Sequence, residues 1–148
     1  MGNKIVGKVL GIALRCKDKT KMTPVSSARA AVDGGLDGDN PVSPDRGITF
    51  IAQGQWQTTI NELGVDLPWW TRRANVLIDA PALAHLIGRR IRVGEVEVDI
   101  KAETKPCDLM DKQHMGLKTT LKPDCRAGVY GRVLQAGTIK ISDTVTVL

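Results

Sequence analysis

The residues best suited to chemistry in this chain gather around one cysteine, Cys107. Pro106 precedes it, Lys105 lies two positions before it, and Asp108 follows it directly. The stretch 104–111 comes after the strongest strand pattern in the chain, and loops that leave rigid strands commonly carry function. A thiolate is both a nucleophile and a metal ligand, and nearby lysines favour it while acidic neighbours oppose it. Cys107 is therefore the leading candidate for a reactive residue; the alternative is a small, buried apolar side chain.

A second group that could bind a ligand is the arginine pair Arg72 and Arg73, which opens another expected strand. A guanidinium donates hydrogen bonds in a planar fork that matches phosphate or carboxylate. The pair suits an anionic ligand, and the alternative is a solvated pair at a strand end. A zinc site built from Cys107, His114 and Cys125 fits no standard ligand spacing, so we do not expect one.

Size and charge limit the remaining choices. A chain of 148 residues predicts a single domain over residues 1–148. The excess of 21 Lys and Arg over 16 Asp and Glu favours a small anionic partner. The basic residues form no stripe interleaved with aromatic residues, so nucleic-acid binding is not the favoured function. The three cysteines lack CxxC spacing, and no 18-residue apolar run occurs. We therefore expect a cytoplasmic protein with reduced thiols and no membrane segment.

Alternating apolar residues and frequent glycines predict many short strands. Residues 4–14 alternate, with Gly7 and Gly11 suited to close packing in a barrel. Residues 90–102 alternate with a change of parity at Gly94, which predicts a hairpin turn or a bulge. Residues 128–148 read as three strands, which predicts a β-meander at the end of the chain.

Helical patterns are few and short. Trp56, Ile60 and Leu63 fall at i, i+4 and i+7 and predict a helix that ends at Gly64. Residues 81–87 predict a second helix opened by proline. Residues 112–124 are polar and include His114. The fold class is therefore mainly β, a barrel of about seven or eight short strands with two or three short helices.

The order of these motifs resembles the MOSC domain, named for the C-terminal region of molybdenum cofactor sulfurases. The resemblance extends over nearly the whole chain and rests on the order and spacing of the motifs. The matching stretches are residues 35–39, 46–49, 73–76, 86–88, 91–94, 105–110, 126–134 and 137–139. Where the family usually has a glycine-aspartate turn near the end, this chain has Ser142 and Asp143.

The resemblance implies a MOSC-type β-barrel with a functional cysteine at Cys107. That cysteine is expected to bind molybdenum of the pterin cofactor or to carry sulfur as a persulfide. Arg73 and Asn75 match an Arg-x-Asn motif that helps to hold the pterin and its phosphate in cofactor-binding relatives. The residues expected to assist in the same anionic cavity are Arg126, Lys105 and Arg46.

The residues and the resemblance leave three alternative functions open. The first is a protein that binds the molybdenum cofactor through Cys107 and reduces N-hydroxylated compounds with electrons from a partner reductase. The second is a sulfur carrier that accepts persulfide sulfur from a cysteine desulfurase dependent on pyridoxal phosphate, with no pyridoxal phosphate site of its own. The third is a non-catalytic module that binds an anionic ligand or nucleic acid, with Cys107 only structural.

Overall fold

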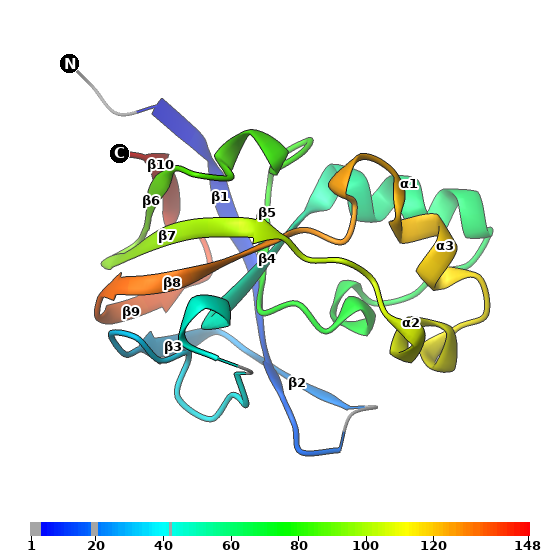
Figure 1. Ribbon diagram of the computed structural model, residues 1–148, viewed down its shortest axis with the longest axis horizontal. Coiled ribbons are helices and arrows are strands. Elements are labelled where there is room, and N and C mark those ends of the chain that lie inside the picture. The colour runs from blue at the N-terminus through cyan, green and yellow to red at the C-terminus, as the bar shows by residue number, and fades with distance from the viewer. Residues whose placement is uncertain (1–3, 19–20, 42) are drawn as a thin grey trace.

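The computed structural model describes residues 4–18, 21–41 and 43–148 (Figure 1). The chain is rich in short strands, joined by short helices and 3₁₀ turns. The strands are β1 (Lys4–Arg15), β2 (Met22–Val25), β3 (Ser27–Ala30), β4 (Ile48–Ala52), β5 (Val76–Ile78), β6 (Arg90–Val93), β7 (Val96–Glu103), β8 (Val129–Gln135), β9 (Gly137–Lys140) and β10 (Thr144–Val147). The α-helices are α1 (Gln53–Leu63), α2 (Asp108–Gln113) and α3 (Leu117–Leu121), and the 3₁₀ turns are η1 (Pro44–Arg46), η2 (Trp69–Arg72), η3 (Ala84–Leu86) and η4 (Pro123–Cys125).

Strand pairing closes the sheet into a barrel. In the described part of the chain, seven strands follow the order β10-β6-β7-β8-β4-β5-β1, and β1 pairs again with β10. β2 extends the sheet beyond β1, while β3 and β9 form a separate two-stranded sheet. Closure leaves the barrel strands with hydrogen-bonding neighbours on both sides, which removes exposed edges. The predicted mainly β barrel is thus confirmed.

The connection from β4 to β5 decides where the helices lie. These two strands run parallel, whereas the other barrel neighbours are antiparallel. Parallel neighbours require a long crossover, and the segment with α1 and η2 supplies it. The helices therefore gather beside the barrel, on the right in Figure 1.

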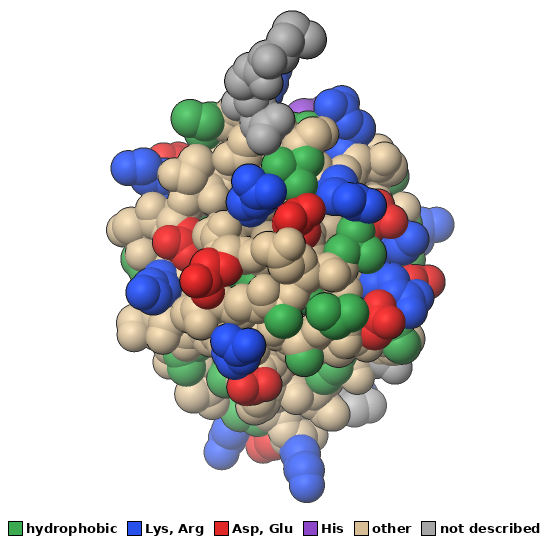
Figure 2. Space-filling view, turned by 90° about the vertical axis from the view of Figure 1, so that its left-hand side faces the viewer, with side chains coloured by type: hydrophobic (Ala, Val, Ile, Leu, Met, Phe, Trp, Pro, Cys, Tyr) green, Lys and Arg blue, Asp and Glu red, His purple; other side chains and the backbone are tan. Residues whose placement is uncertain are grey.

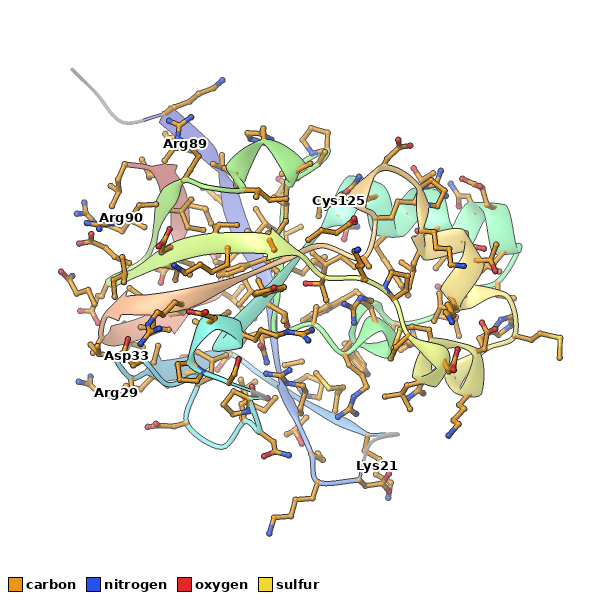
Figure 3. All side chains as sticks on the ribbon, viewed as in Figure 1. Lys21, Arg29, Asp33, Arg89, Arg90 and Cys125 are labelled. Atoms are coloured by element: carbon orange, nitrogen blue, oxygen red, sulfur yellow. The ribbon has the colours of Figure 1, made fainter. Side chains whose placement is uncertain are left out.

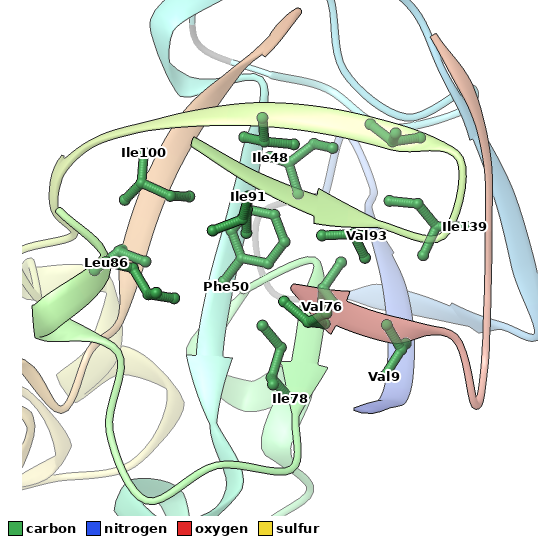
Figure 4. Packing of buried hydrophobic residues seen from close by; sticks show 14 of the residues in the cluster. Val9, Ile48, Phe50, Val76, Ile78, Leu86, Ile91, Val93, Ile100 and Ile139 are labelled. Carbon is green, nitrogen blue, oxygen red and sulfur yellow. The ribbon is translucent and has the colours of Figure 1, made fainter. Parts of the chain in front are cut away.

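The barrel interior is filled by side chains that alternate along the strands. Ile48 and Phe50 of β4 and Val76 and Ile78 of β5 point inward and are nearly or fully buried (Figure 4). The intervening Ile51 belongs to a second apolar cluster beneath the helices. Because β4 lies between the barrel core and the helical layer, its residues are buried on both faces.

The second cluster joins the helices to the barrel wall. Trp56 and Ile60 of α1 pack with Leu117 and Leu121 of α3 and with Met110 of α2. The predicted helix over Trp56 and Ile60 is confirmed, and it ends at a left-handed glycine. α3 was not predicted, although its two leucines lie four residues apart. Within the otherwise polar segment 112–124, α3 buries both leucines against α1.

Two other predictions need correction. The end of the chain is not a meander: β9 pairs with β3, and β10 pairs with β6 and β1. Spacing along the chain predicts strands but not their partners: β10 closes the barrel, whereas β9 pairs with β3 in the separate sheet. Residues 81–87 form only η3 rather than a helix over the full segment. The predicted change of direction at Gly94 is confirmed as the hairpin between β6 and β7.

The barrel side of the molecule has a mixed surface. Figure 2 shows basic and acidic side chains interspersed on this face, with small apolar groups between them. Such a mixture is ordinary for solvated protein surface. No described helix is long and apolar enough to cross a bilayer.

Candidate functional site

A pocket of about 310 Å³ lies where the end of β1, η2 and the start of α2 meet. Its lining combines basic, hydroxyl and thiol side chains from segments far apart in the chain. The lining residues are Arg15, Cys16, Lys17, Asn40, Arg46, Thr49, Arg72, Arg73, Thr104, Cys107, Leu109 and Met110. The volume is at the lower end of the range for small-molecule sites.

Cys107 is the residue directly before α2. Its backbone is extended, with φ −121° and ψ 177°, and its carbonyl accepts a hydrogen bond from the Met110 N–H at 2.9 Å. On the strand side, the Thr104 N–H donates to the Gly128 carbonyl at 2.8 Å. The loop is thus tied to the residue before β8 at one end and to the buried Met110 of α2 at the other. Cys107 itself is a free, exposed thiol.

Arg72 is the buried cation of the pocket. Its side chain is 7% exposed, and its Nε donates to the Ala127 carbonyl at 2.9 Å. Burial lowers the pKa of Arg72 to about 10, since a charged guanidinium is disfavoured away from water. A negative charge on Cys107 opposes this decrease, whereas the positive charges of Arg46 and Arg15 add to it. Crowded like charges of this kind favour an anion between them.

The neighbouring arginines differ in how far their charges are compensated. Arg15 is paired with the buried carboxylate of Asp39, with contacts of 2.8 and 3.3 Å from Nη2 and Nε. Arg73 has a left-handed backbone, φ 65°, and donates from Nη1 to the Lys21 carbonyl at 2.9 Å. Burial lowers the pKa of Arg73, and the charge of Arg15 lowers it further. Arg73 thus has a hydrogen-bond partner but no carboxylate bonded to it among the described residues.

Two buried donors of the pocket lack partners within the described residues. Arg46 lies 4.8 Å above the Tyr130 ring, and its Nε is buried without a hydrogen bond. Thr104 is 3% exposed, and its hydroxyl is also unpaired. An unmade hydrogen bond in a buried place is costly, and most such groups in proteins find a partner. Both residues line the pocket, so a ligand with acceptor oxygens would satisfy them.

Only some of the predicted site residues line the pocket. Cys107, Arg73 and Arg46 meet in the pocket. Lys105 lines an adjoining hollow of about 420 Å³ that shares Arg46 with the pocket. Arg126 does not line the pocket: it pairs with Glu62 at 2.8 Å and donates to the Thr120 carbonyl.

Asn75 is fully buried outside the pocket lining. Its Oδ1 accepts from the N–H and hydroxyl of Thr49, and its Nδ2 donates to the Ala13 carbonyl. These bonds connect β4 to β1 through the start of β5. The side chain is therefore engaged in holding the barrel, and a direct contact with a ligand would require it to give up a bond.

Sequence reasoning missed several of the lining residues. Arg15 and Cys16 come from a segment that no motif connects to Cys107, and Thr104, although it lies in the stretch around Cys107, was not singled out as a site residue. Arg72 was noticed as part of a pair, but the family motif selected its neighbour Arg73. The described residues contain no group of three or more His, Cys, Asp or Glu placed to hold a metal.

The pocket thus brings a free cysteine and several arginines together beside the β-barrel. The family model for the MOSC domain matches residues 37–146, and the chain belongs to the MOSC family. The match includes the candidate residues Arg46, Arg73, Asn75, Lys105, Cys107 and Arg126. No curated protein matches the sequence.

Solved structures share the fold at low sequence identity. YuaD of Bacillus subtilis is 18% identical with a TM-score of 0.75, covering 99% of this chain and 96% of that one. YiiM of Geobacillus stearothermophilus is 16% identical with a TM-score of 0.71, covering 99% and 75%. YiiM of Escherichia coli is 15% identical with a TM-score of 0.73, covering 95% and 69%. At these identities the likeness supports the fold and not a shared activity.

Proposed function

We propose that this MOSC protein binds the molybdenum cofactor in the pocket, with the Cys107 thiolate as the protein's ligand to molybdenum. The observation that carries the proposal is the convergence of this free thiol with Arg72, Arg73 and the unpaired donors of Arg46 and Thr104. A soft thiolate suits a metal that is also held by dithiolene sulfur. The N–H and O–H donors suit the phosphate and carbonyl oxygens of a pterin.

The residues of the pocket have different roles in this proposal. Arg72 and Arg73 supply positive charge and N–H donors for the phosphate or the pterin. Arg46 Nε and Thr104 Oγ1 donate to acceptor oxygens, which completes their own hydrogen bonding. When bound, the cofactor supplies two-electron chemistry for reducing N-hydroxylated compounds, with electrons from a partner reductase. Because Cys107 is exposed, such a partner or substrate has access to it.

The test is metal and pterin analysis of protein made in a host that synthesises the cofactor. Wild-type protein should contain molybdenum and pterin near one equivalent, and Cys107→Ser should contain almost none. Cys125→Ser is the matched control and should leave the content unchanged, since the Cys125 side chain lies outside the pocket and a serine hydroxyl can keep its bond to the Gly128 carbonyl. Molybdenum absent from the wild type, or retained by Cys107→Ser, would refute the proposal.

A second candidate is sulfur carriage, and the exposure of the Cys107 thiol favours it. The Cys107 thiolate would attack the outer sulfur of a desulfurase persulfide. A new sulfur–sulfur bond then forms on Cys107, and the donor cysteine leaves as its thiolate. After incubation with a cysteine desulfurase and cysteine, the Cys107 peptide should gain one sulfur, about 32 Da by mass spectrometry. An unmodified peptide would rule out this candidate and, if molybdenum is also absent, leave a module that binds an anionic ligand.

A further inference from the structure

The guanidinium of Arg72 is held from one side by the segment that leads from η4 into β8. Its Nε donates to the Ala127 carbonyl at 2.9 Å. A planar guanidinium that is buried and bonded at Nε has little freedom left, so its remaining N–H groups are aimed in a set direction. The place of the Ala127 carbonyl therefore determines where the charge of Arg72 lies within the pocket.

The segment before Ala127 has a strained backbone. Asp124 and Cys125 both have left-handed conformations, with φ of 54° and 60°. Residues other than glycine adopt this region at an energetic cost, and two in succession persist only where the surroundings hold them. Gly128 follows with φ 98°, and a Cβ there would collide with the Phe50 carbonyl. The turn is thus packed tightly against β4.

Gln55 of α1 is the side chain that braces this turn. It is 8% exposed, and its Nε2 donates to the Asp124 carbonyl at 2.6 Å. Its Oε1 is buried and has no partner within the described residues. Cys125 lies close to this junction of the barrel and the helical layer (Figure 3). A buried acceptor without a partner costs stability, so the position of Gln55 points to a role of this side chain other than stability.

We propose that Gln55 and the Asp124–Cys125 turn are positioning elements for Arg72, and that Arg72 draws anionic groups to the thiol of Cys107. Arg72 and Cys107 line the same pocket, and a negative charge on Cys107 favours the charged form of Arg72. The chain of contacts runs from the Gln55 amide through the Asp124 carbonyl and the Ala127 carbonyl to the guanidinium. The inference rests on the proposed role of Cys107 as the reacting group, whether toward a metal or toward sulfur.

The test compares two alkylating reagents on Cys107, iodoacetate, which is an anion, and iodoacetamide, which is neutral. Both are attacked by the same thiolate, form a thioether and release iodide. The ratio of their rates therefore cancels the amount of thiolate and measures the local attraction for an anion. Rates are taken from mass spectrometry of the Cys107 peptide. Arg72→Met should lower the ratio about threefold, the effect of one charge some 6 Å away in water.

Gln55→Met keeps the size of the side chain but removes the donor to Asp124. The ratio of the iodoacetate rate to the iodoacetamide rate should fall, as in Arg72→Met, but by less. Thr59→Val is the matched control, because it removes a buried bond within α1, from Thr59 Oγ1 to the Gln55 carbonyl at 2.8 Å, without touching the turn. This control should lose stability and keep the wild-type ratio.

The outcomes separate this inference from the proposed function. A wild-type ratio in Gln55→Met with reduced stability would mean that Gln55 is only structural, and a wild-type ratio in Arg72→Met would overturn the role of Arg72. If Arg72→Met does not fold, Arg72→Gln supplies the same loss of charge in a polar side chain. The experiment needs no cofactor, so lowered ratios together with an absence of molybdenum would refute cofactor binding and leave this inference standing.

Discussion

Replacing Arg72 by methionine should stabilise the fold while removing the response to anions. Burial lowers the pKa of Arg72 from its ordinary value to about 10, with the charges of Arg46, Arg15 and Arg73 acting in the same direction and Cys107 opposing. At about 1.4 kcal/mol per pKa unit, holding the charge costs the folded state about 3 kcal/mol at neutral pH. Losing the bond to the Ala127 carbonyl costs about 1–2 kcal/mol.

The net expectation for Arg72→Met is a gain of about 1–2 kcal/mol, which raises Tm by about 2–4 °C per kcal/mol for a chain of this size. The gain should depend on pH in a defined direction. Below the folded pKa of about 10, the arginine is charged in both states and the full cost applies. As pH rises through 10, the native protein releases this proton before the unfolded chain does, so the wild type gains stability and the difference shrinks.

The assay is thermal unfolding followed by circular dichroism, with and without added phosphate. Wild-type protein should gain about 1.4 kcal/mol when phosphate is at ten times its Kd, and Arg72→Met should gain almost nothing. Arg126→Met is the control, since Arg126 lies outside the pocket and should keep the phosphate response. A marked fall of Tm in Arg72→Met, or an undiminished phosphate response, would refute the reasoning.

Further predictions concern the barrel and the other thiols. Asn75→Ala should destabilise the fold by about 3 kcal/mol, since it leaves buried partners on Thr49 unsatisfied; an unchanged urea midpoint would contradict this. Gly128→Ala should lower the yield of folded protein or reduce stability by more than about 3 kcal/mol, because the new Cβ meets the Phe50 carbonyl. Burial raises the pKa of Cys125 to about 11, so its alkylation rate should increase about tenfold per pH unit up to that value; a plateau below pH 9 would count against this burial.

Local patterns were sufficient for the elements whose signal lies within a few residues. The alternation on either side of Gly94 predicted the hairpin of β6 and β7, and the spacing of Trp56 and Ile60 predicted α1. α3 was not predicted, because only two apolar residues mark so short a helix. The pairing of β9 with β3, in place of a meander, was not predicted either, because these two strands lie far apart in the sequence and pair in a sheet separate from the barrel.

The sequence by itself singled out Cys107, because a thiol between proline, lysine and aspartate on a loop after a strand is recognisable within a few positions. It also established the MOSC resemblance, since the order of motifs along the chain is a one-dimensional property. Only the tertiary structure decided which polar residues accompany the thiol. Asn75 lies inside the barrel wall and Arg72 beside Cys107, although they are three residues apart, because the backbone turns at Arg73 from the pocket into β5. Such a change of surroundings depends on contacts with β1, β4 and the η4 turn, which no local pattern contains.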